Sequence, residues 1–277
     1  MTVPLSVSDW VPAPFELGGH TVFAVGDVHG CAVELAAILD RIGTLARETA
    51  RDRHLIYLGD LIDRGPDNVG VLGLWAEDAK TRGVDQVHRV MGNHEIMMLL
   101  ALEGGAHAPK AEAMWLSAAM GGGHMLEEMR AKTGDTTARP TTALANRALG
   151  PDILRLLTTQ RSHLRIGNAV FVHGGLDPAI AQESFLATPW TEFTDARWAW
   201  INQGFLDWPG GFAGTLVVHG HTPPARHRAL TGQDDPHLFS HDRLGLDGGS
   251  ALTGIVTAAE LRDGRYRILK AGTPREG

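Results

Sequence analysis

Residues 21–30 read TVFAVGDVHG, residues 54–65 read HLIYLGDLIDRG, and residues 87–95 read VHRVMGNHE. In each stretch an apolar run ends at a glycine that is followed by an aspartate or an asparagine. Such a run predicts a buried strand that stops at a loop. Helical patterns follow all three runs, so the order strand, loop, helix occurs three times. This repetition predicts right-handed βαβ units and a parallel sheet.

The rest of the chain predicts a helical insert and then more strands. Residues 104–162 are rich in alanine and are interrupted by glycines and prolines, which indicates several short helices. We expect a helical insert or cap over about 104–163, within one domain that covers 1–277. Further strands are expected over five ranges: 164–172, 215–218, 243–246, 254–261 and 265–269.

Composition and charge exclude several classes of protein. The chain has 277 residues, of which 43% are hydrophobic and 21% are charged, as in ordinary globular proteins. The formal net charge of −7 argues against a nucleic-acid partner. No apolar run approaches the ~20 residues of a membrane span, and Met1–Pro14 does not resemble a signal peptide. With Cys31 as the only cysteine, we expect a cytoplasmic protein that contacts neither membranes nor nucleic acid.

Polar side chains follow the predicted strands at the point where each strand ends. In open α/β sheets, ligands bind at the carboxyl ends of the strands. The side chains that would meet there offer carboxylates, one amide and imidazoles, but no thiolate: Asp27, His29, Asp60, Asn93, His173 and His221. Such ligands suit Mn, Fe, Zn or Co. Six ligands can hold two ions if one carboxylate bridges, and two ions catalyse in-line displacement at phosphorus.

Five sequence blocks in order resemble the metal-site blocks of the phosphoprotein phosphatase family, within the calcineurin-like metallophosphoesterases, and in particular its bacterial serine/threonine phosphatase members. The blocks are GDVHG (26–30), GDLIDRG (59–65), GNHE (92–95), HGG (173–175) and GHT (220–222). The resemblance runs from about Val22 to Leu261. It implies an α/β fold of two packed mixed sheets flanked by helices.

The resemblance also implies a role for each residue. The first ion would take three ligands: Asp27, His29 and Asp60. The second ion would share Asp60 and take three more: Asn93, His173 and His221. His94 would act as the general acid toward the leaving group, paired with Asp63, and this pairing should favour protonated His94. Arg64 would hold the phosphoryl oxygens with its planar fork.

Several other residues are interpreted as ordinary structural residues or mark a departure from the family. His219 is expected to line the site or support a ligand. Cys31 is interpreted as a packing residue rather than a nucleophile. Related bacterial members tend to carry a second phosphate-binding arginine where this chain has Asn202. Arg197 lies nearby, but five residues apart on a helix is not the same face.

The leading prediction is therefore a dinuclear metal-dependent phosphomonoesterase, in which a water activated by the ions attacks phosphorus in line. Manganese is the favoured metal, with Fe, Zn, Ni and Co as alternatives. The substrate would be a phosphoprotein or a small phosphoester, selected by residues 104–162 and 175–198. One alternative is a symmetrical diadenosine tetraphosphate hydrolase, although those relatives usually carry alanine in place of Asp63. The other is a non-catalytic phosphate- or nucleotide-binding module, which only Asn202 supports.

Overall fold

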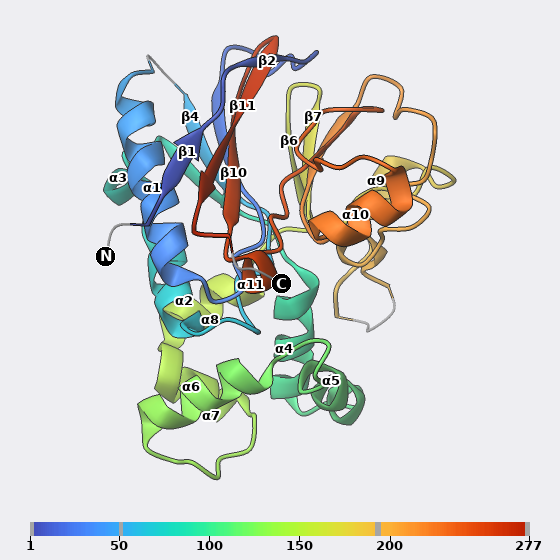
Figure 1. The fold of residues 1–277 in the computed structure, drawn as a ribbon. Coiled ribbons are helices and arrows are strands. Elements are labelled where there is room, and N and C mark those ends of the chain that lie inside the picture. Colours follow the sequence, from blue (N-terminus) through green and yellow to red (C-terminus); the bar gives the residue numbers. More distant parts are fainter. Residues whose placement is uncertain (1–2, 50–51, 192–194, 275–277) are drawn as a thin grey trace.

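The strands form two sheets that pack face to face (Figure 1). The computed structural model describes residues 3–49, 52–191 and 195–274. The larger sheet has the order β1-β11-β10-β3-β4-β5, with β2 paired to β11. Its strands are β1 Leu5–Val7, β2 Val11–Pro12, β3 Thr21–Val25, β4 Arg53–Tyr57, β5 Gln86–Arg89, β10 Val256–Arg262 and β11 Arg265–Ala271. The smaller sheet has the order β6-β7-β8-β9, from β6 His163–Ile166, β7 Ala169–Val172, β8 Leu216–His219 and β9 Arg243–Gly245.

Both sheets are mixed, as the sequence resemblance implied. Strands β3, β4 and β5 are parallel, which confirms the predicted parallel units, whereas β10 pairs antiparallel with β3. In the smaller sheet β7, β8 and β9 are parallel and β6 is antiparallel to β7. The register places Val25 beside Tyr57 and Tyr57 beside Arg89. The carboxyl ends of these strands therefore meet at one edge.

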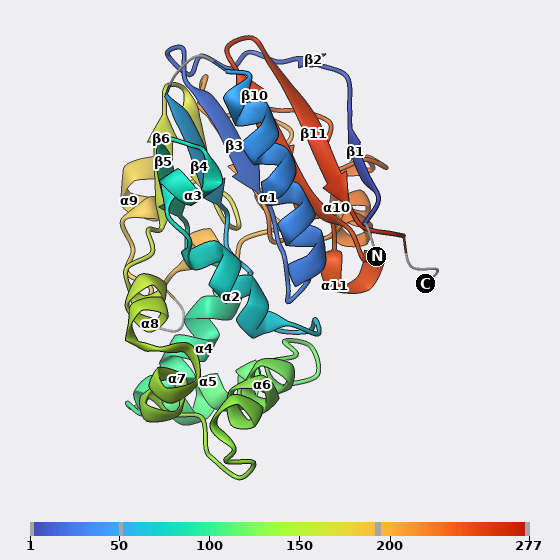
Figure 2. The ribbon, with the colours of Figure 1, turned by 90° about the vertical axis from the view of Figure 1, so that its left-hand side faces the viewer.

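Helices cover the outer face of the larger sheet and extend below the strand ends (Figure 2). Those beside the sheet are α1 Ala32–Arg47 and the short α3 Ala79–Arg82. Below the strand ends lie α2 Asn68–Ala76, α4 Asn93–Glu103 and the helices of the predicted insert, which are α5 Ala108–Trp115, α6 Gly123–Thr133, α7 Thr142–Leu149 and α8 Pro151–Thr158. The remaining short helices are α9 Gln182–Leu186, the 3-10 turn η1 Arg197–Ala199, α10 Pro224–Thr231 and α11 Ser250–Thr253. None of the described helices has the length and apolar content needed to cross a bilayer.

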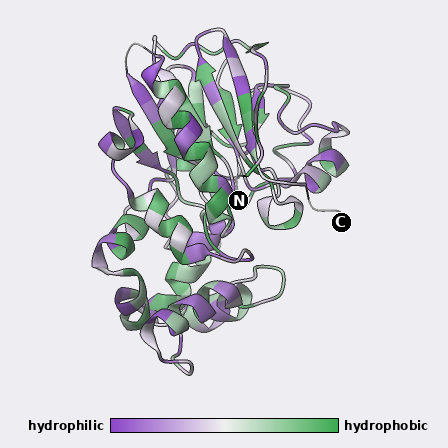
Figure 3. Ribbon diagram, turned by 60° about the vertical axis from the view of Figure 1, so that its left-hand side comes forward, coloured by the Kyte–Doolittle hydropathy of each residue, from purple (hydrophilic) through white to green (hydrophobic). Residues whose placement is uncertain are grey.

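Alternation along the strands produces two hydrophobic layers. Val22 and Ala24 of β3 face the layer between the sheets, where they meet Phe171 of β7 and Val218 of β8. Phe23 of β3 faces the opposite side, in the cluster that includes the apolar face of α1. Figure 3 shows hydrophobic residues concentrated on the central strands, and both kinds of residue along the helices. Burial on both faces explains why these strands are almost continuously apolar in the sequence.

Two elements differ from the sequence prediction for local reasons. The second of the predicted helical stretches, which covers residues 68–82, is two helices, because Asp78 caps a new one by accepting a hydrogen bond from the Thr81 N–H at 2.8 Å. The single strand expected over 164–172 is the hairpin β6–β7, which turns at Gly167 with φ +56°.

Candidate metal centre

The six predicted metal ligands converge where strands from both sheets end. They are Asp27 and His29 after β3, Asp60 after β4, Asn93 at the start of α4, His173 after β7 and His221 after β8. Five of the six are buried, and His221 is partly buried. Within the described part of the chain, two candidate metal-binding groups are His29, Asp60 and His94, and Asp60, His173 and His221. Asp60 belongs to both groups.

Glycines allow the ligand-bearing loops to approach one another. A Cβ on Gly59 would lie 2.5 Å from the Gly92 nitrogen, and one on Gly92 would lie 2.3 Å from the Asp60 nitrogen. A Cβ on Gly220 would lie 2.1 Å from Asp27 Oδ1. These distances are shorter than any real van der Waals contact, so a side chain at these positions would push the ligands apart.

Backbone strain also concentrates at this edge. Five predicted site residues that are not glycine have positive φ, from 44° to 74°: His29, Asp60, Asp63, Arg64 and His221. Such conformations cost of order 1–3 kcal/mol each and persist only where the surrounding structure imposes them. The chain maintains this strain in the loops that carry its polar cluster.

Backbone carbonyls determine which nitrogen of each ligand histidine carries the proton. His29 Nδ1 lies 2.8 Å from the Ile62 carbonyl oxygen, and His173 Nδ1 lies 2.8 Å from that of Leu58. His221 Nε2 lies 3.1 Å from the Trp200 carbonyl oxygen. Because a carbonyl can only accept, each of these nitrogens must donate. The opposite nitrogen of each neutral ring is left with a lone pair, as a metal ligand requires.

The lone pairs of His173 and His221 point at other acceptors, and this arrangement fits a bound cation. His173 Nε2 lies 3.0 Å from Asn93 Oδ1 and 3.2 Å from Asp60 Oδ1, and His221 Nδ1 lies 2.9 Å from the same Asn93 oxygen. Burial alone would lower the pKa of His173, but nearby carboxylates, chiefly Asp60, raise it to about 10. The position therefore strongly favours positive charge, which a divalent ion would supply.

The carboxylates at the centre of the cluster face both groups. Asp60 Oδ1 faces His173, whereas its Oδ2 lies 3.8 Å from His29 Nε2 and 3.8 Å from His94 Nε2. Both oxygens of Asp27 accept the His221 N–H, at 3.0 and 3.1 Å. Burial, and after it the neighbouring Asp247 and Asp60, raise the pKa of Asp27 well above its usual value. A cation would relieve this repulsion.

His94 is hydrogen-bonded to Asp63, as expected, and burial shifts the pKa of both residues. His94 Nδ1 lies 2.7 Å from Asp63 Oδ2. Burial lowers the pKa of His94 to about 4 and raises that of Asp63 well above its usual value. Burial therefore opposes a doubly protonated His94 in the isolated chain, and the expected effect of Asp63 on that protonation stays a prediction. His94 Nδ1 faces Asp63, and Nε2 faces the cluster, 3.8 Å from Asp60 Oδ2.

Arg64 is exposed beside the cluster, as a substrate contact should be. Its Nη1 donates to His29 Nε2 at 2.9 Å, and its Nη2 donates to the Ala119 carbonyl oxygen at 3.1 Å. The two residues considered for a second phosphate contact have other partners in this structure. Arg197 is paired with Asp177 at 2.6 Å, and the Asn202 side chain accepts the N–H of its neighbour Gln203.

Two further acidic residues at the site were missed by sequence reasoning. The buried Glu95 carboxylate accepts the N–H groups of Asp60 at 2.9 Å, Leu61 at 2.8 Å and Gly92 at 3.1 Å, so it joins two ligand loops. Glu95 stands three residues after Gly92, the N-cap of α4, and a glutamate at that position is a sequence signal for hydrogen bonding to the N-cap backbone. Asp247 follows β9 and lies close enough to Asp27 to raise that residue's pKa. Like Asp27 and Asp60, Asp247 comes soon after the end of a strand, but it lies outside the five sequence blocks that predicted the site.

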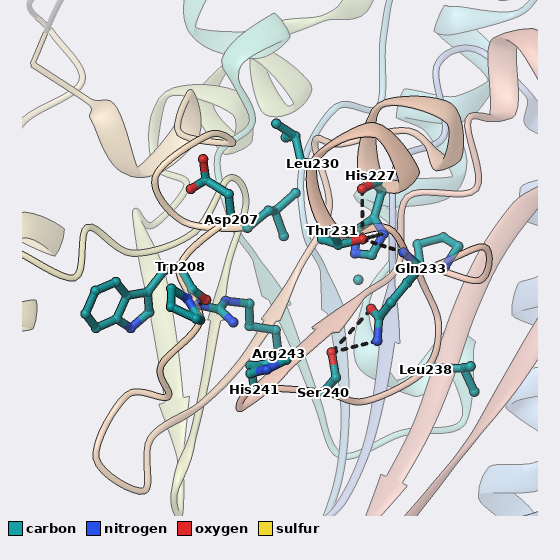
Figure 4. Close-up of a pocket in the computed structure, with 14 residues that line it drawn as sticks. Asp207, Trp208, His227, Leu230, Thr231, Gln233, Leu238, Ser240, His241 and Arg243 are labelled. Carbon is teal, nitrogen blue, oxygen red and sulfur yellow. Dashed lines mark hydrogen bonds between the residues drawn. The ribbon is translucent and has the colours of Figure 1, made fainter.

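A separate pocket lies between α10 and the loops around β9 (Figure 4). Its volume is about 220 Å³, and it is lined by residues that include Trp208, His227 and Arg243. Gln233 and Ser240 are hydrogen-bonded to each other in it. None of the six predicted ligands lines this pocket. This pocket is therefore distinct from the site formed by the predicted metal ligands.

Comparisons with known proteins agree with this geometry. Residues 20–248 match the family described as calcineurin-like phosphoesterase. A symmetrical bis(5'-nucleosyl)-tetraphosphatase of Chromohalobacter salexigens is 27% identical, over 92% of this chain and 100% of the relative. Serine/threonine-protein phosphatase 1 of Salmonella typhimurium is 29% identical, over 87% of this chain and 92% of the relative. A mutant cold-active protein tyrosine phosphatase shares the fold, with a TM-score of 0.52 at 17% identity, over 90% of this chain and 78% of its own.

The fold and its oxygen- and imidazole-rich cluster define a metallophosphoesterase. The chain belongs to the calcineurin-like phosphoesterase family, whose model matches most of its length. It is accordingly a metal-dependent phosphoester hydrolase.

Proposed function

We propose that this chain is a dinuclear phosphomonoesterase of the serine/threonine phosphatase type, acting on a phosphoprotein or a small phosphoester. The observation that carries the proposal is the hydrogen bond of 2.7 Å between His94 and Asp63, beside the Asp60-centred cluster. An ester of an alcohol or phenol has a poor leaving group that must receive a proton, so a positioned general acid has a purpose there.

The ligand assignment is part of this proposal. One ion would be held by Asp27, His29 and Asp60, and the other by Asp60, Asn93, His173 and His221. The support is that both oxygens of Asp60 face histidine nitrogens and that backbone carbonyls orient the histidines. When bound, two such ions supply Lewis acidity and lower the pKa of a bound water. Manganese is the metal we propose, because three of the six ligand residues offer hard oxygen donors.

The chain's own residues would manage the proton and the phosphoryl charge. His94 Nε2 lies 3.8 Å from Asp60 Oδ2, too far for a hydrogen bond, so its proton stays available to a leaving-group oxygen. Arg64 would exchange its present partners, His29 and the Ala119 carbonyl, for phosphoryl oxygens. We also propose a cytoplasmic location, on the ground that Cys31 is the only cysteine.

A second candidate is a symmetrical dinucleotide tetraphosphatase, because the relative from Chromohalobacter salexigens has that activity in its name and aligns along its whole length. Symmetrical cleavage of a dinucleotide tetraphosphate has a nucleoside diphosphate as its leaving group, and its phosphate oxygen leaves without strong protonation. The intact pair of His94 and Asp63 therefore favours the phosphomonoesterase.

The test is hydrolysis of p-nitrophenyl phosphate by metal-stripped protein to which Mn²⁺, Zn²⁺, Ni²⁺ or Mg²⁺ is added back singly. We expect metal-dependent release of nitrophenol, strongest with Mn²⁺. With phenyl phosphate, whose leaving group needs a proton, His94→Asn should reduce turnover by about 10²-fold or more with unchanged metal content. Hydrolysis of diadenosine tetraphosphate without hydrolysis of p-nitrophenyl phosphate would replace the proposal with the second candidate. Turnover that survives His94→Asn would remove the general-acid assignment.

A further inference from the structure

The carboxylate of Asp63 has a second partner that the family blocks do not contain. Trp115, the last residue of α5 in the helical insert, directs its indole Nε1–H at both oxygens of Asp63, at 3.0 Å each. Both side chains are fully buried, with 0% exposure. The Trp115 indole, Asp63 and His94 therefore form one buried series of hydrogen bonds that ends beside the predicted metal ligand Asp60.

Resting on the proposed function, we infer that Trp115 is a positioning residue for the general acid. Its N–H contacts Asp63 and not the reacting atoms, so it acts by holding the carboxylate with Oδ2 toward His94 Nδ1. A carboxylate without this donor could rotate about its χ2 bond, which is a soft torsion. The imidazole would then lose its fixed tautomer and orientation.

The same segment of the insert holds both active-site residues of the neighbouring loop. The carbonyl oxygen of Gly121 accepts the Arg64 N–H at 3.2 Å, and that of Ala119 accepts the Arg64 guanidinium. Gly122 packs on the tryptophan, since a Cβ there would lie 2.3 Å from Trp115 Nε1. The helical insert thus helps to position Asp63, the partner of His94, and also Arg64.

The experiment compares two substrates that differ in their need for an acid. Nitrophenolate leaves p-nitrophenyl phosphate readily, whereas phenyl phosphate has a leaving group of higher pKa. Trp115→Phe keeps the ring and removes the donor. We expect kcat for phenyl phosphate to fall about tenfold, kcat for p-nitrophenyl phosphate to fall less than about threefold, and both KM values to stay unchanged.

The chain offers a matched control in Trp75 of α2. It is also fully buried, and among the residues that the structure describes its indole nitrogen has no hydrogen-bond partner. Trp75→Phe makes the same chemical change and should leave both kcat values unaltered. In an Asp63→Asn background, Trp115→Phe should cause no further loss, because the indole acts only through the carboxylate.

The outcomes separate this inference from the proposed function. A wild-type protein that hydrolyses neither substrate with any metal overturns both. Active wild type combined with equal losses for the two substrates, or with additive losses in the double variant, overturns only the role of Trp115. If Trp115→Phe does not fold, indole ¹⁵N–¹H spectra decide: Asp63→Asn must shift the Trp115 resonance and leave that of Trp75 in place, and an unmoved Trp115 resonance overturns the inference.

Discussion

Glu95 is the residue whose replacement tests how the ligand loops are held. One of its carboxylate oxygens accepts the N–H groups of Asp60 and Gly92, and the other accepts that of Leu61. In Glu95→Gln an amide NH₂ must replace one of these oxygens. The least costly orientation turns the NH₂ toward Leu61, and one buried N–H then loses its acceptor. The cost of such a group is about 1–3 kcal/mol.

The substitution should also weaken metal binding. Asp60 is the residue shared by both candidate groups, and Glu95 fixes its backbone. Loss of a group that orients a metal ligand typically reduces affinity by about 10–100-fold. Burial, and then Asp60, raise the pKa of Glu95 to about 7, so measurements belong at about pH 8, where the carboxylate form is the reference.

The assays are urea unfolding followed by circular dichroism and calorimetric titration of stripped protein with Mn²⁺. Glu128→Gln is the matched control, because Glu128 likewise accepts the backbone N–H groups of Asn68 and Val69, at 2.9 and 2.8 Å. It should lower stability and leave Mn²⁺ affinity unchanged. An unfolding free energy for Glu95→Gln within about 0.5 kcal/mol of wild type, with equal Mn²⁺ affinity, refutes the reasoning.

Three other outcomes are expected. Gly59→Ala should lower the unfolding free energy by at least about 2 kcal/mol, because φ is +98° and the added Cβ meets the Gly92 nitrogen; a calorimetric melting scan like that of wild type would contradict this. Removal of metal with a chelator should lower the melting temperature, and Mn²⁺ at about 100 times its Kd should restore about 2.7 kcal/mol; no restoration argues against the site. The half-buried His88, linked to His54 at 2.9 Å, has its pKa lowered by burial to about 4. Because its folded pKa is depressed, stability should be lost as pH falls from about 6.5 toward 4, and urea titrations of His88→Gln should show a shallower loss.

Local sequence was sufficient for the elements whose signal is short-range. The apolar runs at 21–25 and 54–58 predicted β3 and β4 to within a residue, because burial on both faces demands continuous hydrophobicity. The short strands β1 and β2 escaped notice, because three- and two-residue strands at a sheet edge carry almost no pattern. The glycines that end the strands pointed to the loops, and the polar residues after them are the ones that converge.

The class of chemistry is specified locally: five ordered blocks supply oxygen and imidazole donors, and side-chain type sets which metals and reactions they suit. The supporting contacts, in contrast, arise from how distant elements pack together. Trp115 reaches Asp63 across 52 residues, and the Trp200 carbonyl orients His221 across 21. Neither partner has a marked residue type, since any carbonyl can accept and a buried tryptophan is usually core. Such contacts depend on how separate elements pack, and local sequence patterns do not predict that packing.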